Sequence, residues 1–583
     1  MVVSVLGDEG YKKGVNKFLF PKSLYFGNTV KTITNLSIDF ANGAEPVTVL
    51  PDQIVNVNYT TLGNKKLNIV VNFSDGTSKN TVADIIPRIS ISDFISANKV
   101  TQSFDETIIA DLGGFVPYNT TGVDEFQDRS PEIPGRGDLR IYYDKTMAPA
   151  TKLADLNISK PVIILDGFDP GDGRTQDSLY VNQFQYDKNY FPSPTSNIVE
   201  NLVAAGFQVF VLNFPSYKIA DDYHIDRETK EVFLTEVKRD GGADYIERNG
   251  MVLVKLIQKI NQRLGDLNKT DKISIVGPSM GGLISRYALT YMEQRNLNPN
   301  TKLWISFDSP HHGANINIGS QIFFKRVSSG IFLKATDKGR DQLKTVAAKQ
   351  LMIHHYTRVL YPKAGDDCRV IRGHLFHETF FNTINAMGFP QTTCNVALIN
   401  GRMDGTLQES APANCGISLY SQTGINAVSI LFCAPFMLRH LNDLRFINGF
   451  DVRISPRNNE ICTVYESSYY VGAIPRKYDV IGNGKATSLD ITQGGYYKVN
   501  DEVPDYFFFK RVFTNQSFIP TVSSIALINT SGDWNRNLTG INIPLETPFK
   551  AIYSAQTANE DHVLITSGAV NFIKAKLLSS TCN

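Results

Sequence analysis

Gly277, Ser279 and Gly281 form the pattern G-x-S-x-G in the stretch "IVGPSMGG". An apolar run from Ile273 to Val276 precedes the pattern, and a helix-like run from Leu283 to Arg295 follows it. A serine on a tight strand-to-helix turn has strained dihedral angles, and only glycine-sized neighbours let the strand and the helix approach so closely. Because such a turn lifts the hydroxyl out of the sheet, the spacing predicts that Ser279 is a nucleophile. A plain glycine-rich turn is the alternative.

A serine hydroxyl needs a base within hydrogen-bond reach, and that base needs a carboxylate partner once it carries a proton. We expect the base late in the chain, just after the last strand. His562 has this place, because "FKAIYSAQTANEDHVLIT" reads as strand, loop, histidine and helix. His374 and His377 form an H-x-x-H pair, but no third ligand is apparent, so no metal site is predicted.

Two aspartates compete for the role of the acid. Asp404 follows an apolar run in "VALINGRMDGT", at the point where the chain order serine, aspartate, histidine expects the acid. Asp308 in "WISFDSPHHGAN" ends the strand that comes directly after the serine, and it could reach the same imidazole. We favour Asp404 and keep Asp308 as the alternative, whose other role would be to hydrogen-bond the turn that follows it.

An acyl-transfer site also needs two preorganised donors for the oxyanion. The backbone N–H of Met280, directly after the serine, is the first candidate. The second is Phe168 in the loop "DGFDPGDG", where Gly167 allows close approach. The acidic residues of this loop are too closely spaced for a calcium loop, so no metal or other cofactor is predicted.

The pattern of apolar residues divides the chain into two parts. Short alternating strands with turn signals fill residues from about 15 to 110, which predicts a small β-sandwich-like domain over 1–128. Beyond the link "RSPEIPGRGD", apolar runs alternate with amphipathic helical patterns, which indicates a doubly wound α/β domain over 129–583. Irregular blocks at about 314–392 and 406–515 are interpreted as cap insertions on the same sheet.

The composition excludes several classes of function. In 583 residues, 58 Lys plus Arg nearly balance 57 Asp plus Glu, so the formal charge is +1 and a nucleic-acid surface is not expected. No run reaches the ~18 apolar residues of a membrane span. All six cysteines lie after residue 367, as disulfides of an exported protein or as reduced thiols. We expect a secreted or periplasmic protein whose signal peptide is absent from this sequence, or otherwise a cytoplasmic one.

Taken together, "GPSMGGLISRYAL", "DGF", "DSPHHGAN", "NGRMDG" and "NEDHV" resemble an α/β-hydrolase of the bacterial lipase and esterase type, similar also to GPI-inositol deacylase-like lipases. The resemblance covers roughly residues 139–313, 394–406 and 518–578. It departs from the family in two places. The usual His-Gly of the oxyanion loop is Asp166-Gly167 here, and the D-G-x-V-P acid segment is split, with Asp404-Gly405 standing alone.

The resemblance implies a serine hydrolase that cleaves carboxylic esters, such as lipid or other acyl esters, through a Ser-His-Asp triad and an acyl-enzyme. Two apolar segments, Gly424–Leu438 and Tyr506–Phe513, could line an acyl pocket or touch a lipid surface transiently, or could simply pack the core of the cap. An amidase or peptidase on the same fold is an alternative, because the same machinery cleaves amides. A catalytically inactive binding protein on a hydrolase scaffold is the other.

Overall fold

The computed structural model describes most of the chain, in two compact units. Residues 1–100 and 177–201 belong to one unit, and residues 101–176 and 202–583 to the other. The described residues are 14–20, 32–61, 65–85, 99–110, 134–186, 196–225, 232–327, 339, 341–360, 370–408, 447–454, 463–471, 474–481, 489–498, 515–530, 533–579 and 582.

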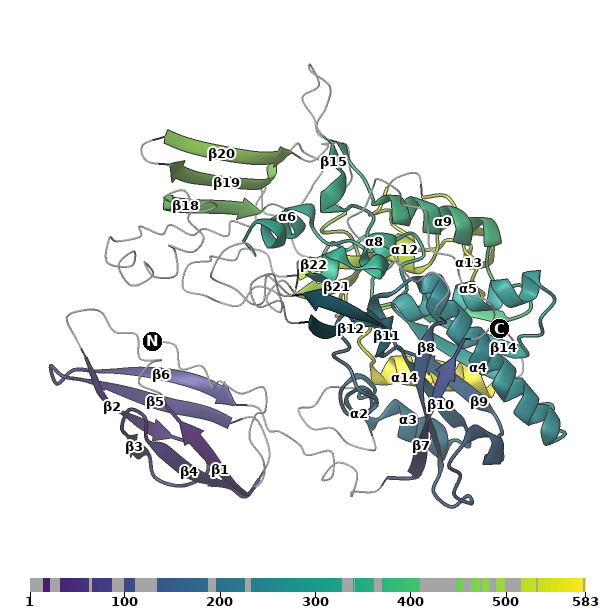
Figure 1. The fold of residues 1–583 in the computed structure, drawn as a ribbon, viewed down its shortest axis with the longest axis horizontal. Coiled ribbons are helices and arrows are strands. Elements are labelled where there is room, and N and C mark those ends of the chain that lie inside the picture. Colours follow the sequence, from purple (N-terminus) through teal and green to yellow (C-terminus); the bar gives the residue numbers. More distant parts are fainter. Residues whose placement is uncertain are drawn as a thin grey trace. The chain divides into compact units, whose positions relative to one another are not determined.

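The N-terminal unit is a small all-β domain with two antiparallel sheets (Figure 1, purple). One sheet pairs β1 (Gly14–Leu19) with β4 (Ile54–Tyr59), and the other has the order β3-β2-β5-β6, with bounds Val47–Val49, Ile33–Asp39, Lys65–Phe73 and Ser78–Ile85. Alternate residues of each strand point inward, and side chains of both sheets share one apolar core. The predicted all-β domain is therefore present.

The predicted boundary at residue 128 lies too late in the chain. Strand β7 (Thr101–Ile109) reads as one more short alternating strand, but it pairs antiparallel with β8 (Arg136–Asp144) in the large sheet of the second unit. The division between the two units therefore comes at residue 100. Alternation alone could not reveal this, because an edge strand of an α/β sheet has the same pattern as a strand of a sandwich.

The second unit is built on an eight-stranded sheet with the order β23-β17-β14-β13-β9-β10-β8-β7. All neighbours from β10 to β23 pair in parallel, whereas β8 is antiparallel to both β7 and β10. The bounds of the remaining strands are β9 (Pro161–Leu165), β10 (Gln208–Asn213), β13 (Ile273–Pro278), β14 (Thr301–Phe307), β17 (Cys394–Leu398) and β23 (Ala551–Tyr553). The predicted α/β fold is confirmed.

Apolar strands buried along their whole length need cover on both faces, and helices supply it. Helices α4 (Ile246–Asp266) and α5 (Met280–Gln294) pack against each other, and α14 (Ser567–Leu578) contacts β14. Inward side chains of α4 and α5 join those of the strands in one large core. The shorter helices α2 (Gln176–Ser178), α3 (Ile198–Ala204), α12 (Thr521–Ser524) and α13 (Ile543–Glu546) lie in the connections.

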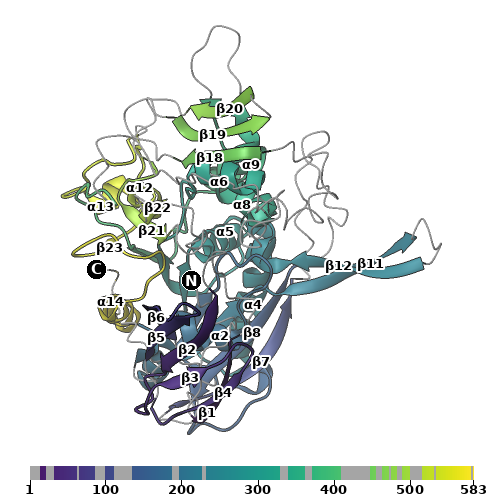
Figure 2. The same ribbon diagram turned by 90° about the vertical axis from the view of Figure 1, so that its left-hand side faces the viewer.

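Insertions follow three strands of the large sheet. After β10 comes a long hairpin of β11 (Ser216–Ile225) and β12 (Val232–Asp240), which the sequence did not predict (Figure 2). The first predicted cap block contains α6 (Ile318–Val327), α8 (Val346–Leu351), the short pair β15 (Val359–Leu360) and β16 (Val370–Ile371), and α9 (Leu375–Met387). The second contains β18 (Ile447–Ile454), β19 (Thr463–Val471), β20 (Ile474–Ile481) and β21 (Gly494–Lys498), and it runs up to β22 (Asn515–Pro520).

The apolar segments Gly424–Leu438 and Tyr506–Phe513 lie outside the described residues. Among the helices that are described, none combines the length and the apolar character needed to cross a bilayer.

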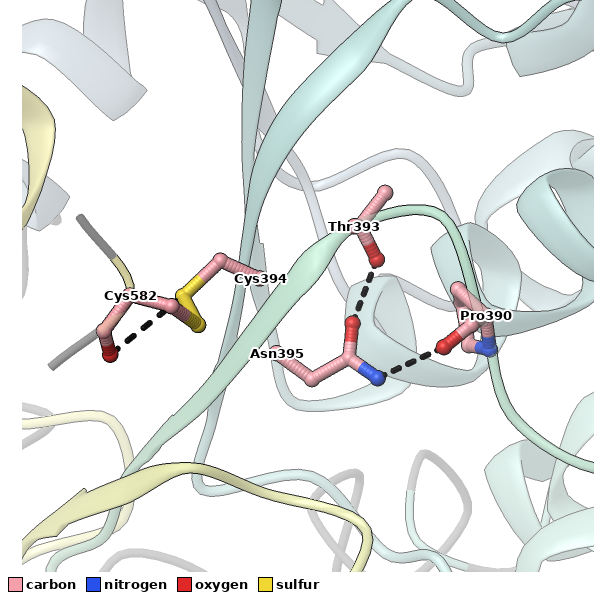
Figure 3. Close-up of a disulfide and its surroundings, with 5 residues drawn as sticks. All are labelled: Pro390, Thr393, Cys394, Asn395 and Cys582. Carbon is pink, nitrogen blue, oxygen red and sulfur yellow. Dashed lines mark hydrogen bonds between the residues drawn. A yellow bond between two sulfur atoms is a disulfide. The ribbon is translucent and has the colours of Figure 1, made fainter. Parts of the chain in front are cut away.

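A disulfide joins Cys394, the first residue of β17, to Cys582 just beyond α14 (Figure 3). Beside it, the Thr393 hydroxyl donates to the side-chain oxygen of Asn395, whose amide donates to the Pro390 carbonyl at 2.8 Å. The C-terminal segment is therefore fixed covalently to the start of a central strand. The other four cysteines, at positions 368, 415, 433 and 462, lie outside the described residues.

Candidate active site

Ser279 lies on a sharp turn between β13 and α5. Its φ of 52° and ψ of −128° are unfavourable for a residue with a side chain, and its amide donates to the Phe307 carbonyl at 2.8 Å. A side chain at either glycine of the motif would clash with neighbouring backbone atoms. A Cβ at Gly277 would lie 2.6 Å from the Gly281 carbonyl oxygen, and one at Gly281 would lie 3.0 Å from the Asp166 carbonyl oxygen. The turn therefore presents the hydroxyl at the carboxyl end of β13.

His562, in the loop between β23 and α14, bridges this serine and a carboxylate. Its Nε2 lies 2.8 Å from Ser279 Oγ, and its Nδ1 lies 2.7 Å from Asp308 Oδ2. Since an ionised carboxylate only accepts, Nδ1–H donates to Asp308 and Nε2 is left to accept from the serine hydroxyl. The Asp308 side chain is fully buried and that of His562 is 14% exposed. The three side chains thus form one continuous hydrogen-bonded chain.

The acid on the histidine is Asp308, and not Asp404, which the sequence favoured. Strands β13 and β14 are paired so that Pro278 faces Phe307, and the next residue of each strand, Ser279 and Asp308, turns with a positive φ. Their side chains therefore leave the same edge of the sheet together. The signal was present in the sequence, because the strand directly after the serine motif ends in this aspartate.

Asp404 is occupied elsewhere. Its carboxylate is bonded to the Arg402 guanidinium, and it accepts from the amide and hydroxyl of Thr406 at 3.1 and 2.6 Å. The hydrogen bond from Arg402, followed by that from Thr406, holds the pKa of this carboxyl well below its usual range. Asp404 thus shapes the loop after β17 and makes no hydrogen bond to His562.

Two residues that sequence reasoning missed surround Asp308. The backbone amide of Asn400 donates to Asp308 Oδ1 at 3.3 Å, and the Asn400 side-chain amide donates to Glu560 Oε2 at 2.9 Å. Burial raises the pKa of Glu560, and the charge of Asp308 raises it further. The hydrogen bond from Asn400 lowers the same pKa and offsets part of this rise. The base of the site therefore holds two carboxyl groups linked through one asparagine.

The β21–β22 hairpin at the end of the second insertion supports the histidine loop. The Tyr496 amide donates to the Glu560 carbonyl at 3.0 Å, and the Tyr496 carbonyl accepts from the His562 amide at 2.8 Å. The ring of Phe518 on β22 meets the His562 imidazole edge to face, with centroids 4.8 Å apart. Gly495 lies against Asp308, because a Cβ there would be 2.0 Å from Asp308 Oδ2. The hairpin is thus packed directly onto the site.

The predicted oxyanion residues lie in two elements next to Ser279. Met280 opens α5, and Gly167 brings the loop after β9 so close that its Cβ would be 3.2 Å from Ser279 Cβ. The Gly167 amide donates to Asp166 Oδ1 at 2.8 Å, so it is occupied. Among the described residues, no hydrogen-bond acceptor is found for the amides of Phe168 or Met280. These two amides are the donors that remain.

Asp166 is the strongest electrostatic feature of this loop. It is buried, Arg174 Nη2 lies 3.1 Å from its Oδ1, and its Oδ2 has no hydrogen-bond partner. Burial raises the pKa of Asp166 to about 6, although Arg174 and the Gly167 amide both act to lower it, and Asp169 adds a smaller rise.

The H-x-x-H pair is occupied by structural hydrogen bonds. His374 Nδ1 accepts from the Phe376 amide at the start of α9, and His377 Nδ1 lies 2.8 Å from the Gln350 carbonyl oxygen. Burial lowers the pKa of His377 to about 4, so its ring is neutral. In the part of the chain that the structure describes, no group of three or more His, Cys, Asp or Glu side chains could hold a metal ion.

Residues 244–354 match the family described as "Putative serine esterase (DUF676)". The matched segment contains the serine turn, strand β14 and Asp308. The match agrees with the resemblance to α/β-hydrolases that the sequence motifs indicate. The family match, which covers Ser279 and the aspartate that the structure connects to it through His562, supports ester hydrolysis by a serine hydrolase.

Solved esterase structures are similar to this chain at low identity. They include brefeldin A esterase, described as a bacterial homologue of human hormone sensitive lipase (8% identity, TM-score 0.20, 52% of this chain and 61% of that one). An esterase from Rhizomucor miehei is 10% identical, with a TM-score of 0.24 over 53% of this chain and 72% of that one. The rice cell wall degrading esterase LipA from Xanthomonas oryzae is also 10% identical, with a TM-score of 0.25 over 53% of this chain and 79% of that one. The chain thus spans less than two thirds of brefeldin A esterase. No curated protein matches its sequence.

The raised pKa of Asp166 predicts a pH-dependent stability. The folded state holds this proton up to about pH 6, whereas the unfolded chain releases it near 3.8, the ordinary pKa of an aspartate. Ionising Asp166 therefore costs stability as the pH rises through this window, by about 3 kcal/mol at most. Because Asp166→Asn removes the ionisation, the variant should gain in melting temperature relative to the native chain between pH 4 and pH 7.

The matched control for that measurement is Asp404→Asn. The pKa of Asp404 is lowered, so this carboxyl is ionised in the folded state throughout the window, and the difference from the native chain should stay nearly constant. A constant difference for Asp166→Asn as well would contradict the electrostatic account of the loop.

Gly495→Ala tests whether the hairpin is packed on the carboxylate as tightly as the distances indicate. A methyl group cannot share the space 2.0 Å from Asp308 Oδ2, so Asp308 or the strand must move. We expect ester hydrolysis to fall by about 100-fold, because displacing a catalytic group by roughly 1 Å has effects of this size. The control is Gly265→Ala in α4, where a Cβ meets nothing within 4 Å. Equal activities in the two variants would refute the packing argument.

Proposed function

We propose that this hydrolase cleaves carboxylic esters through an acyl-enzyme on Ser279, with His562 as general base and acid and Asp308 as the residue that orients it. The observation that carries the proposal is the continuous chain of hydrogen bonds from Asp308 through His562 to Ser279. Three side chains that are 29 and 254 positions apart along the sequence would not align in this way by local structure alone.

The geometry supports a two-step mechanism. As Ser279 Oγ attacks the acyl carbonyl carbon, its proton passes to His562 Nε2, and the imidazolium is stabilised by the buried carboxylate of Asp308. His562 then donates this proton to the leaving alkoxide, and an acyl-serine remains. Water attacks the acyl-serine in the same way, with His562 accepting its proton and returning it to Ser279.

The negative charge of the tetrahedral intermediate needs donors that are already in place. We assign this role to the amides of Met280 and Phe168. Their position on two elements that meet beside Ser279, and their lack of an acceptor among the described residues, support the assignment. Gly167 contributes by its small size, since its own amide is bonded to Asp166.

We propose lipid or other acyl esters as the substrate class, and activity outside the reducing cytosol. The apolar ring of Phe518 lies against His562, which suits an acyl chain better than a charged head group. The disulfide between Cys394 and Cys582 is of the kind that persists in secreted or periplasmic proteins. Transient contact with a lipid surface fits the same substrate class.

The experiment is hydrolysis of p-nitrophenyl esters from acetate to palmitate by the native chain and by Ser279→Ala. We expect turnover by the native chain and a loss of roughly 10⁴-fold or more in the variant, because the nucleophile and its base act as a unit. Absence of turnover, together with failure of a fluorophosphonate to label Ser279, would overturn the proposal and favour an inactive binding protein. Cleavage of the matching anilides at a comparable rate would favour an amidase.

A further inference from the structure

The loop between β9 and α2 carries a polar network that has no part in the steps above. It begins with Asp166-Gly167-Phe168-Asp169 directly after β9 and ends with Arg174. In this loop the resemblance to lipases leads to the expectation of a histidine before the glycine, and an aspartate stands there instead. A donor amide is useful only if its loop is held still, so the contacts of Arg174 bear directly on catalysis.

The Arg174 side chain touches three of the four residues of Asp166–Asp169. Its Nη2 donates to the Phe168 carbonyl at 2.7 Å and lies 3.1 Å from Asp166 Oδ1. Its Nε lies 3.7 Å from Asp169 Oδ1, and its backbone amide donates to Asp169 Oδ2 at 2.8 Å. One guanidinium therefore contacts the residue two positions before the proposed donor, the donor residue itself and the residue after it.

Arg174 is itself anchored to the sheet. Its carbonyl accepts from the Asn213 side-chain amide at 3.0 Å, and Asn213 is the last residue of β10. Nearby, the Gln176 side-chain amide donates to the Asp138 carbonyl at 2.7 Å. The segment that carries Arg174 is therefore attached to two neighbouring strands, β10 and β8, so the Arg174 side chain extends from a fixed backbone.

From these contacts we propose that Arg174 is a positioning residue, which fixes the oxyanion loop through Asp166, Phe168 and Asp169 and keeps the Phe168 amide beside Ser279. The inference rests on the proposed function, since it needs the acyl-transfer site described above. Arg174 touches no reacting atom. Arg174 supports the loop by an ion pair with Asp166 and a hydrogen bond to the Phe168 carbonyl. These contacts take the place of the histidine that the resemblance to lipases leads us to expect.

A role of this kind has a kinetic signature. A misplaced donor weakens binding of the transition state and leaves binding of the ground-state ester nearly intact, so kcat should fall while KM changes little. For Arg174→Ala we expect kcat for p-nitrophenyl acetate to drop about 10- to 100-fold, with KM within about 3-fold of the native value. Arg174→Lys, which keeps the charge and loses the fork of donors, should give an intermediate kcat.

Chemical rescue separates positioning from simple loss of fold. The Arg174 side chain is 27% exposed, so added guanidinium ion at low, non-denaturing concentration can enter the space left in Arg174→Ala. We expect it to restore part of kcat. The control is Arg140→Ala, which breaks the ion pair between Arg140 and Asp105 on β8 and β7 of the same sheet, away from the site. The control should keep its kcat and show no rescue.

The outcomes are distinct. Native-like kcat in Arg174→Ala, or a loss matched by the unfolded fraction in circular dichroism and insensitive to guanidinium, would overturn the role of Arg174 while the native chain still hydrolyses the ester. If the native chain neither hydrolyses the ester nor takes up fluorophosphonate on Ser279, the proposed function fails, and this inference fails with it.

Discussion

The parallel pairing of β13 with β14 is the constraint on which the rest of the site depends. The register places Pro278 opposite Phe307, so the residues that follow, Ser279 and Asp308, leave the sheet side by side. Both turn with a positive φ, and the Ser279 amide is bonded to the Phe307 carbonyl. A single imidazole can therefore span the two side chains.

Once this pair is fixed, the remaining elements have to bring one histidine to it and hold it there. His562 lies in the loop that follows the last strand of the sheet. The backbone amide and carbonyl of Tyr496 in the β21–β22 hairpin both form hydrogen bonds to this loop. The second insertion therefore forms part of the site, because Gly495 in its final hairpin packs directly against the buried carboxylate of Asp308. On the other side of Ser279, the Asp166–Arg174 pair organises the loop that carries the Phe168 amide.

The parts of this site that could be predicted from the sequence are those with a local signature. Ser279 was identified by the glycines that its turn requires, and His562 by its place after the last apolar run. The choice between Asp308 and Asp404 depends on which strand lies beside β13 and on what else each carboxylate can bond. Arg402 lies two residues before Asp404, but nothing in the sequence showed that it would hold that carboxylate.

The same reasoning explains the other differences. Strand β7 has the alternation of a sandwich strand, and only its pairing with β8 assigns it to the large sheet. The β11–β12 hairpin was not predicted from the sequence. The roles of Glu560 and Asn400 arise from a contact between segments far apart in the chain, which no pattern of neighbouring residues encodes. Arg174 and its partners share one loop, but the conformation that brings them together has no sequence pattern of its own.

The most direct test of the account is the rate at which a fluorophosphonate labels Ser279 in Asp308→Asn and in Asp404→Asn. Labelling needs the serine to be activated by His562 but needs no particular ester, so it reports on the hydrogen-bonded chain alone. The account predicts a loss of roughly 10³- to 10⁴-fold for Asp308→Asn and a rate within a few-fold of the native chain for Asp404→Asn. A large loss in Asp404→Asn with little change in Asp308→Asn would contradict it.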